Sequence, residues 1–516
     1  MIPVAACAVL LLCLPQAQDE AKALAAFRRA FAPPAKGTLS DPDARTRALA
    51  ALEGLESLSV AKAYVDAHLQ LEAEIASVEQ DRARISEQIA KVLEGQERSE
   101  RRDLPNQKNL LYHDLKLQAD RLRKALDDQQ ALGEALRARV DRLQSRDTVA
   151  WLLANVQRDR RQALSLKVAI ARRAASLVPP MAVELGKALE VARANDELIP
   201  ALIGIGALGK QGAQMLDPVL HLLGHKEEAV RVEAASALAR MAQGRAILPL
   251  IDLLEVERGQ AAVAVSRALE TITSQRHGTS VSTWRAWFKA EGARFVSGAE
   301  PLGRGRPGER RSASGGTSSY FDIPQDGKGI VYVIDCSGSM QREIQLRTGQ
   351  TTAGGEVPTT TRMEACKAEL IRALGSLETG KAFNIVWFND MVHAWQPRMV
   401  KSDTATVAAA QAWVRELGPS SSTNIHDAVQ RAFAFVGRGA SDRYYGTEVD
   451  TIFLLTDGSP TRPDNSPDST DAILVSVRQW NALKRVVIHC IAIGKELNAG
   501  FLRQLADENG GEYRAY

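Results

Sequence analysis

The sequence has few cysteines and few of the motifs that hold transition metals. Only 5 cysteines occur in 516 residues, and two of them, Cys7 and Cys13, lie in an apolar run at the N-terminus. The other three, Cys336, Cys366 and Cys490, are widely spaced, which is not the pattern of a disulfide-rich domain. Neither a CxxC nor an HExxH motif is present, which argues against a zinc site.

A strong excess of charge of either sign is also missing. The 65 basic and 62 acidic residues leave a formal charge of +3, so no global field attracts nucleic acid or an anionic membrane, and no nucleic-acid partner is expected. Aromatic residues make up only 5%, whereas the hydrophobic share of 45% is ordinary for a soluble protein. The length predicts roughly three domains.

Long apolar runs are absent beyond the N-terminus. The run from Val4 to Leu14, followed by Pro15 and Ala17, predicts a secretory signal peptide over residues 1–18, although it lacks a basic start and a frayed apolar N-terminus is the alternative. No later stretch approaches the ~18 uncharged apolar residues of a membrane span, so no transmembrane segment is expected after signal removal. We therefore expect an exported protein of the periplasm, the cell envelope or the extracellular space.

The first half of the chain has helical periodicity. Residues 19–67 are predicted to be a helical segment, interpreted as HEAT-like. Apolar residues then alternate at spacings of 4 and 3 over 71–92 and again over 115–143, which is a heptad pattern. The charged stretch 94–107 separates them, so we predict a coiled-coil helical hairpin over 68–148, with arms of about 45 Å. A parallel dimer is the alternative, and self-association through the coiled coil stays open.

An internal repeat follows the hairpin. Residues 149–295 contain a pattern displaced by 31 positions, which predicts HEAT-like helical repeats, with a generic Ala/Leu-rich bundle as the alternative. Residues 296–327 are rich in Gly, Ser, Pro and Arg and are predicted to be a flexible linker. The repeated positions are Pro218, Leu222, Leu223, Val232, Ala237 and Leu238, matched by Pro249, Leu253, Leu254, Val263, Ala268 and Leu269.

From residue 328 the pattern changes to strands that alternate with helices. Apolar runs at 330–334, 382–388, 450–455 and 486–493 read as strands, and amphipathic segments at 362–377, 404–417, 424–436, 471–483 and 501–509 read as helices. This alternation predicts a doubly wound, mostly parallel sheet with its ligand site beyond the carboxyl ends of the strands. The expected fold class is therefore multidomain: an all-α N-terminal region followed by an α/β domain at 328–516.

Polar side chains occupy the ends of these predicted strands. Asp335 ends the first strand and is followed by Ser337 and Ser339, Thr423 lies in a loop just before a helix, and Asp457 ends a central strand. Because the carboxyl ends of parallel strands meet at one rim, we expect the five side chains to converge. A hard dication such as Mg²⁺ wants about six oxygen ligands and keeps several waters. The five residues are therefore candidate metal ligands.

These motifs resemble the metal-ion-dependent adhesion site of von Willebrand factor A (VWA) domains. Its three parts are matched by Asp-x-Ser-x-Ser at 335–339, Ser-Thr-Asn-Ile at 422–425 and Thr-Asp-Gly at 456–458, and the Ile-Asp-x-Ser-Gly-Ser-Met stretch at 334–340 is similar to bacterial secreted or envelope members. The resemblance covers roughly 328–516, with a polar insertion at 341–361. It implies direct metal contact by Ser337, Ser339 and Thr423, and contact largely through water by Asp335 and Asp457.

The resemblance also implies a non-catalytic function in which a protein partner offers an Asp or Glu carboxylate to the metal. The expected cofactor is a divalent cation, with Mg²⁺ favoured over Mn²⁺ or Ca²⁺, and the helical repeats serve as a scaffold. A structural protein that binds its partner through the solenoid and coiled coil, with the VWA domain as anchor, is one alternative. A hydrolase is the other: Ser337 would need His393, His426 or His489 as base, but the Gly-x-Ser-x-Gly elbow is missing.

Overall fold

The chain folds into two compact units, Met1–Gly212 and Ala213–Tyr516. A computed structural model describes residues 19–35, 38–97, 105–299, 302, 318–345, 359–420, 422–435, 448–457, 459–462, 466–494 and 498–516. The predicted signal peptide at 1–18, most of the predicted linker at 296–327 and the middle of the 341–361 insertion lie outside these residues. Within them, no helix combines the length and the apolar character needed to cross a membrane.

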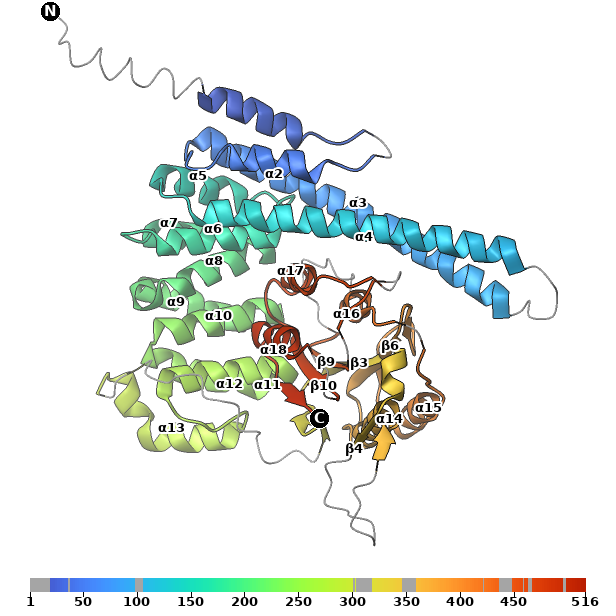
Figure 1. Ribbon diagram of the computed structural model, residues 1–516. Helices are drawn as coiled ribbons and strands as arrows, with labels where there is room; N and C mark the ends of the chain where they lie inside the picture. Colours follow the sequence, from blue (N-terminus) through green and yellow to red (C-terminus); the bar gives the residue numbers. More distant parts are fainter. Residues whose placement is uncertain are drawn as a thin grey trace, which may run out of the picture. The chain divides into compact units, whose positions relative to one another are not determined.

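The first unit is helical throughout its described residues (Figure 1). Its core joins a helix over 19–30 to the hairpin helices, because Phe27, Leu52 and Tyr64 are all buried in one cluster with Leu136. Its remaining helices are α2 (Pro42–Ala50), α3 (Leu58–Glu97), α4 (Pro105–Asp141), α5 (Arg146–Val156), α6 (Leu164–Ser176), α7 (Ala182–Val191) and α8 (Asn195–Ala207).

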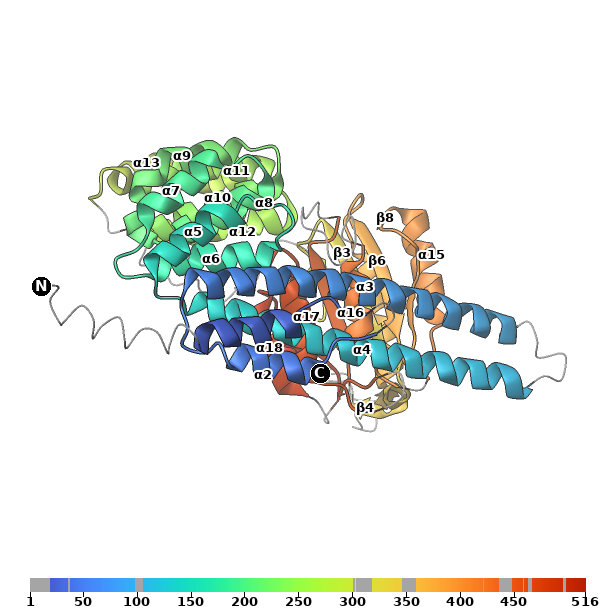
Figure 2. The ribbon, with the colours of Figure 1, turned by 90° about the horizontal axis from the view of Figure 1, so that it is seen from above.

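Helices α3 and α4 form an antiparallel pair within one chain, and they lie side by side in both views (Figure 1, Figure 2). Gln129 donates to Glu74 at 3.1 Å, and Arg137 lies 3.2 Å from His68, so the pairing runs in opposite directions along the two helices. The heptad pattern predicted this hairpin from residue 68, but α3 begins at Leu58. The first two turns of α3 lie before the predicted heptad seam, and they are buried in a cluster that also includes the N-terminal helices.

The second unit begins with helix pairs. Helices α9 (Leu216–His221) and α10 (Glu228–Met241) contain the first copy of the 31-residue repeat, and α11 (Ile247–Val256) and α12 (Gly259–Thr273) contain the second. Each copy supplies one short and one longer α-helix, but Leu222 and Leu223 lie in a 3₁₀ helix (Leu222–Gly224), whereas their counterparts Leu253 and Leu254 lie in α11. A further helix, α13 (Val281–Val296), buries Trp284 completely.

The rest of the second unit is built on a seven-stranded sheet. Its order is β11-β10-β9-β3-β6-β7, and β8 also pairs with β6. All pairings among β11, β10, β9, β3 and β6 are parallel, whereas β7 and β8 are antiparallel, so the predicted doubly wound, mostly parallel sheet is confirmed. The strands are β3 (Gly329–Asp335), β6 (Ala382–Phe388), β7 (Val392–Ala394), β8 (Val400–Lys401), β9 (Thr451–Thr456), β10 (Val487–Ala492) and β11 (Tyr513–Ala515).

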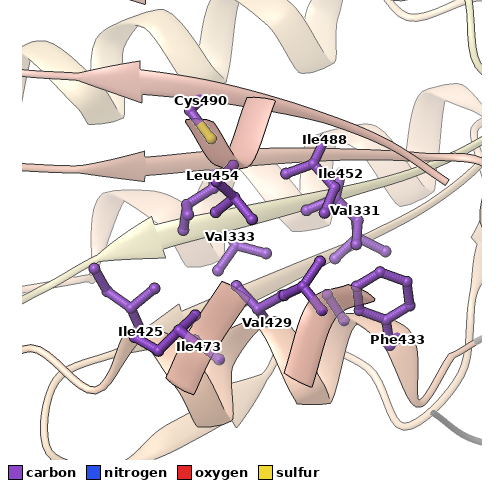
Figure 3. Close-up of a cluster of buried hydrophobic side chains, with 14 of the residues drawn as sticks. Val331, Val333, Ile425, Val429, Phe433, Ile452, Leu454, Ile473, Ile488 and Cys490 are labelled. Atoms are coloured by element: carbon purple, nitrogen blue, oxygen red, sulfur yellow. The ribbon is translucent and has the colours of Figure 1, made fainter. Parts of the chain in front are cut away.

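Helices cover both faces of this sheet. Because side chains alternate along a strand, Val331 and Val333 of β3 enter one apolar core while Ile330, Tyr332 and Ile334 enter the other. Helices α16 (Ile425–Phe433), α17 (Thr470–Trp480) and α18 (Ala499–Glu508) close the first core, and α14 (Arg362–Gly375) and α15 (Thr404–Arg415) close the second. Figure 3 shows the first core, where valines and isoleucines of the strands face Ile425, Val429, Phe433 and Ile473.

The helix pairs of the second unit are tied to the amino-terminal edge of the sheet. Asp450, directly before β9, accepts hydrogen bonds from the backbone N–H groups of Gln260 in α12 (3.1 Å), Lys328 (3.0 Å) and Gly329 (3.2 Å). Glu228, the first residue of α10, pairs with Lys328 and with Arg485. These contacts lie where β3, β9 and β10 begin, which leaves the carboxyl ends of the strands at the opposite edge.

Candidate metal site

Asp335 is held at the carboxyl end of β3 by two hydrogen bonds. Its Oδ1 atom accepts from the backbone N–H of Ser337 at 2.8 Å, and its Oδ2 atom accepts from the hydroxyl of Thr456 at 2.6 Å. The second contact follows from strand register: Ile334 lies opposite Leu455, so the next residues along the parallel strands are Asp335 and Thr456. Both carboxylate oxygens are therefore fixed by the local fold.

The two serines of the first motif face the third motif. The short 3₁₀ helix Gly338–Gln341 turns the chain directly after β3. The hydroxyl oxygens of Ser337 and Ser339 are 3.0 Å apart, and Ser339 donates to Asp457 Oδ1 at 2.7 Å. The structure thus brings Ser337, Ser339 and Asp457 into one chain of hydrogen bonds beside Asp335.

The loop that carries Thr423 contacts the first motif and the segment that follows the third motif. Ser420 donates from its N–H to the carbonyl of Cys336 at 2.7 Å. Thr423 donates from its N–H to the hydroxyl of Thr461 and accepts from the N–H of Thr461, both at 2.8 Å. The Thr423 loop therefore lies beside the first motif and beside Thr461, and the participation of the Thr423 hydroxyl in the site stays a prediction. Gly458, in the third motif, lies outside the described residues.

Burial and like charge act together on Asp335. Removal from water raises the pKa of its carboxyl group to about 6, and the neighbouring Asp457 carboxylate adds to the increase, against the hydrogen bonds from Ser337 and Thr456. A site of this kind favours the approach of a cation, because a positive charge offsets both the desolvation and the repulsion. Hydroxyl and carboxylate oxygens are also the donors that a hard dication prefers, so the residues fit such an ion.

Arg362 also belongs to this site, although the sequence does not reveal it. Its Nη1 atom donates to Asp457 Oδ2 at 2.7 Å, and the two side chains are only 6% and 0% exposed. Arg362 is the first residue of α14, directly after the insertion. In the sequence an arginine at a helix start has no feature that distinguishes a buried ion pair from a solvated side chain, and no signal in this chain could have found it.

The histidines considered as catalytic bases have other contacts. The imidazole of His426 is fully buried, with Nδ1 2.6 Å from Asp427 and Nε2 3.2 Å from Ser476. It points inward because α16 places it on the face packed against α17. His489 is a buried residue of β10 that stacks on Phe453.

Cysteine and metal-binding side chains complete the description of the site. Cys336 and Cys366 are buried free thiols, and burial raises the pKa of both above its usual range, so neither is a reactive thiolate at neutral pH. Among the residues that the structure describes, no group of three or more His, Cys, Asp or Glu side chains is arranged to hold a metal. A metal ion at this rim would therefore depend on serine and threonine oxygens in addition to the two aspartates.

Comparison with known proteins identifies the α/β part of the chain. Residues 357–515 match the family model of the von Willebrand factor type A domain. With the sheet described above, the C-terminal part of the chain is a VWA domain. The match begins after Asp335, Ser337 and Ser339, so it bears on the domain as a whole and not on the first motif.

The matches to curated relatives cover only part of this chain. Inter-alpha-trypsin inhibitor heavy chain H4 of Homo sapiens is 31% identical over 186 residues, which cover 36% of this chain and 18% of the relative. Heavy chain H1 of Mesocricetus auratus is 28% identical over 199 residues, covering 37% and 19%. The chain thus spans about a fifth of the length of these relatives. A solved von Willebrand factor type A protein from Catenulispora acidiphila is 21% identical, covers 36% of this chain and 38% of its own, and superposes with a TM-score of 0.28.

Proposed function

We propose that the VWA domain binds a divalent cation and uses it to hold a protein partner, without catalysing a reaction. Ser337, Ser339 and Thr423 would contact the ion directly, and Asp335 and Asp457 would hold it largely through water. Mg²⁺ is the favoured ion, with Mn²⁺ and Ca²⁺ as alternatives. The proposal rests above all on the continuous chain of oxygens from Ser337 through Ser339 to Asp457.

The chemistry of these donors explains why the site would bind a partner. Neutral hydroxyls neutralise none of the charge of a dication, so a bound ion supplies an electrophilic centre that attracts an anionic oxygen. A Glu or Asp carboxylate on the surface of another protein meets that requirement. The helical units would then act as a scaffold for the binding domain.

The names of the relatives agree with binding rather than catalysis. They are described as heavy chains of inter-alpha-trypsin inhibitor, that is, as components of an inhibitor. Export of this protein is part of the proposal. It rests on the apolar run near the N-terminus and on the polar residues that follow this run. An exported protein would act in the periplasm, in the cell envelope or outside the cell, and this location belongs to the same proposal.

Calorimetric titration with Mg²⁺ tests the metal site. The full chain, treated with chelator and dialysed, should bind one equivalent, and a variant with Ser337→Ala and Ser339→Ala should bind at least about ten-fold more weakly, since it lacks two direct donors. Ser297→Ala, which changes an exposed serine after α13, serves as the control. Equal heats for the double variant and the wild type would exclude these serines as ligands.

A capture experiment tests the second half of the proposal. Proteins retained by the immobilised full chain in Mg²⁺ should be released by EDTA, because the chelator removes the bridging ion. The double serine variant should retain them no better in Mg²⁺ than the wild type does in EDTA. Retention that survives both the chelator and the double substitution would place partner binding elsewhere, for example on the helical repeats.

A further inference from the structure

Arg362 contacts the candidate metal site from outside the five predicted positions and brings a charged side chain to it. We propose that Arg362 sets the charge of this site: it lowers the affinity for the cation and, in exchange, makes the loaded site select an anionic group on the partner. This inference rests on the proposed metal-dependent function and concerns which chemistry the loaded site accepts.

The position of the Arg362 backbone is fixed from both sides. Thr361 caps α14 by accepting from the N–H of Glu364 at 3.1 Å, and the N–H of Arg362 donates to the carbonyl of Arg342 at 2.9 Å. The second contact closes the base of the insertion, where β4 (Glu343–Gln345) pairs with β5 (Thr359–Thr361). The side chain therefore starts from a rigid point beside the metal rim.

The guanidinium group is also enclosed. Gly494, two residues beyond β10, has φ of +107°, and a Cβ atom added there would lie 2.5 Å from Cζ and 2.6 Å from Nε and Nη2 of Arg362. Only a glycine allows this close approach of backbone and side chain. The side chain of Arg362 is only 6% exposed. This packing holds the guanidinium group against Asp457 and keeps water away from the pair. A guanidinium remains protonated even when buried, so its charge is permanent.

The positive charge of Arg362 changes the net charge of the whole site. Asp335 and Asp457 without Arg362 would carry a formal charge of −2, which a dication would neutralise. With Arg362 they carry −1, so the loaded site retains one positive charge. The metal is then bound less tightly than two free carboxylates would allow, and the surplus charge attracts an anionic oxygen such as a carboxylate. A neutral partner group, for instance a carbonyl, is attracted much less strongly by this surplus positive charge.

Two measurements on four variants separate this effect from a purely structural one. The variants of the full chain are Arg362→Met and Arg362→Gln, which remove the charge, Arg362→Lys, which keeps it, and Arg415→Met, an exposed arginine of α15 in the same domain, as control. Mg²⁺ affinity is measured by calorimetry. Anion binding is measured on the Mn²⁺-loaded protein from the ¹⁹F relaxation of trifluoroacetate, a simple carboxylate probe.

The proposal predicts opposite changes in the two affinities. R362M and R362Q should bind Mg²⁺ at least about ten-fold more tightly than the wild type, because a full charge a few ångströms from a dication in a poorly solvated site is removed. The same variants should bind trifluoroacetate several-fold more weakly. R362K and R415M should match the wild type in both measurements. R362Q keeps a hydrogen-bond donor for Asp457, so it carries the test if R362M does not fold.

Other outcomes overturn the inference in distinguishable ways. If the wild type binds Mg²⁺ but R362M and R362Q bind it equally or more weakly, Arg362 only positions Asp457 and the inference fails while the metal site stands. Tighter Mg²⁺ binding without weaker trifluoroacetate binding would overturn the part that concerns the partner. If the wild type itself binds no Mg²⁺, the proposed function fails and this inference fails with it.

Discussion

At the scale of single residues, burial shifts the pKa values of Asp335 and His68 in opposite directions. Burial disfavours the charged form of any group, so it raises the pKa of the Asp335 carboxyl and lowers that of the His68 imidazole to about 3. Arg137, 3.2 Å from His68 Nε2, adds to the decrease. His68 is therefore neutral at neutral pH, and its 3.8 Å approach to Glu72 is not an ion pair.

His68 makes the stability of the first unit depend on pH. Its pKa is about 6.5 in the unfolded chain and about 3 in the folded protein, so between these values the unfolded chain takes up a proton that the folded protein does not. The free energy of unfolding should therefore fall by about 1.4 kcal/mol per pH unit as the pH decreases through this window. His68→Leu should remove that contribution, and its stability should depend less on pH.

Hydrogen exchange of peptides from α3 and α4, measured by mass spectrometry at pH 7 and pH 5, reads the local opening free energy. After correction for intrinsic exchange, the wild type should lose more protection than His68→Leu on going to pH 5. His113→Gln, an exposed histidine of α4, should behave like the wild type. An identical pH response in all three proteins would mean that His68 accepts a proton in the folded state.

At the scale of elements, a buried ion pair joins α2 to the hairpin. Arg45 of α2 makes two hydrogen bonds of 2.8 Å to the carboxylate of Glu74 in α3, and both side chains are buried. Gln129 of α4 donates to the same carboxylate at 3.1 Å, and Gln70 donates to it at 2.9 Å. The carboxylate of Glu74 thus contacts three helices, which fixes the position of α2 along the hairpin.

Removal of one partner of this pair should be far more costly than removal of both. Glu74→Leu leaves the Arg45 guanidinium buried without a counter-ion, and we expect it to lower the free energy of unfolding by about 3–5 kcal/mol. The double variant Arg45→Met with Glu74→Leu leaves no buried charge and should recover most of that loss. Urea denaturation followed by circular dichroism, at constant pH, measures both.

The exposed pair Lys91–Glu87 on the same helix is the matched control, and Glu87→Gln should leave the denaturation curve almost unchanged. The double variant decides the matter: if it is as unstable as Glu74→Leu alone, the loss comes from packing around the site and not from an unpaired charge.

The elements themselves were largely predictable. Strand Ala382–Phe388 was predicted with its observed bounds, and the other predicted strands and helices of the VWA domain differ by a few residues at their ends. Their periodicity is a local property, so a window of sequence contains it. Strands β7, β8 and β11 were not predicted, because two or three residues are too few for a periodic pattern and their pairing depends on β6 and β10.

At the scale of the whole molecule, Asp450 connects the repeats of the second unit to the sheet. Its carboxylate accepts from three backbone N–H groups, contributed by α12 and by the start of β3. Glu228 adds a second connection from α10 to Lys328 and Arg485. Helices and sheet are joined by polar contacts at the edge away from the candidate metal site, so the metal rim is not part of this junction.

Asp450→Ala should uncouple these two parts. It leaves three backbone N–H groups without their acceptor, at about 1–3 kcal/mol for each group that stays buried. Scanning calorimetry should show a lower transition temperature for the second unit and separate transitions for helices and sheet. Asp450→Asn, which keeps one acceptor oxygen, should have a smaller effect.

Asp217→Asn breaks an exposed ion pair with Arg245 and is the control, expected to leave the scan unchanged. A single unshifted transition in Asp450→Ala would mean that this carboxylate does not couple the repeats to the sheet.

The sequence by itself determined the order of domains, the alternation of strands and helices, and the residues that stand where strands end. These features depend on neighbours within a few positions: the period of apolar residues, and the position of Asp335 and Asp457 next to apolar runs. Because parallel strands end at a common rim, the approach of Asp335 and Ser339 to the third motif was also predictable from the sequence.

Only the tertiary structure decided which side chains contact one another across that rim and across the core. The pairing of Arg362 with Asp457, the inward direction of His426 and the start of α3 at Leu58 all depend on residues far away in the chain. The sequence does not distinguish a charged side chain that is exposed to water from one that forms a buried ion pair. Its environment arises only when distant segments pack together, and that environment sets its charge balance and its role.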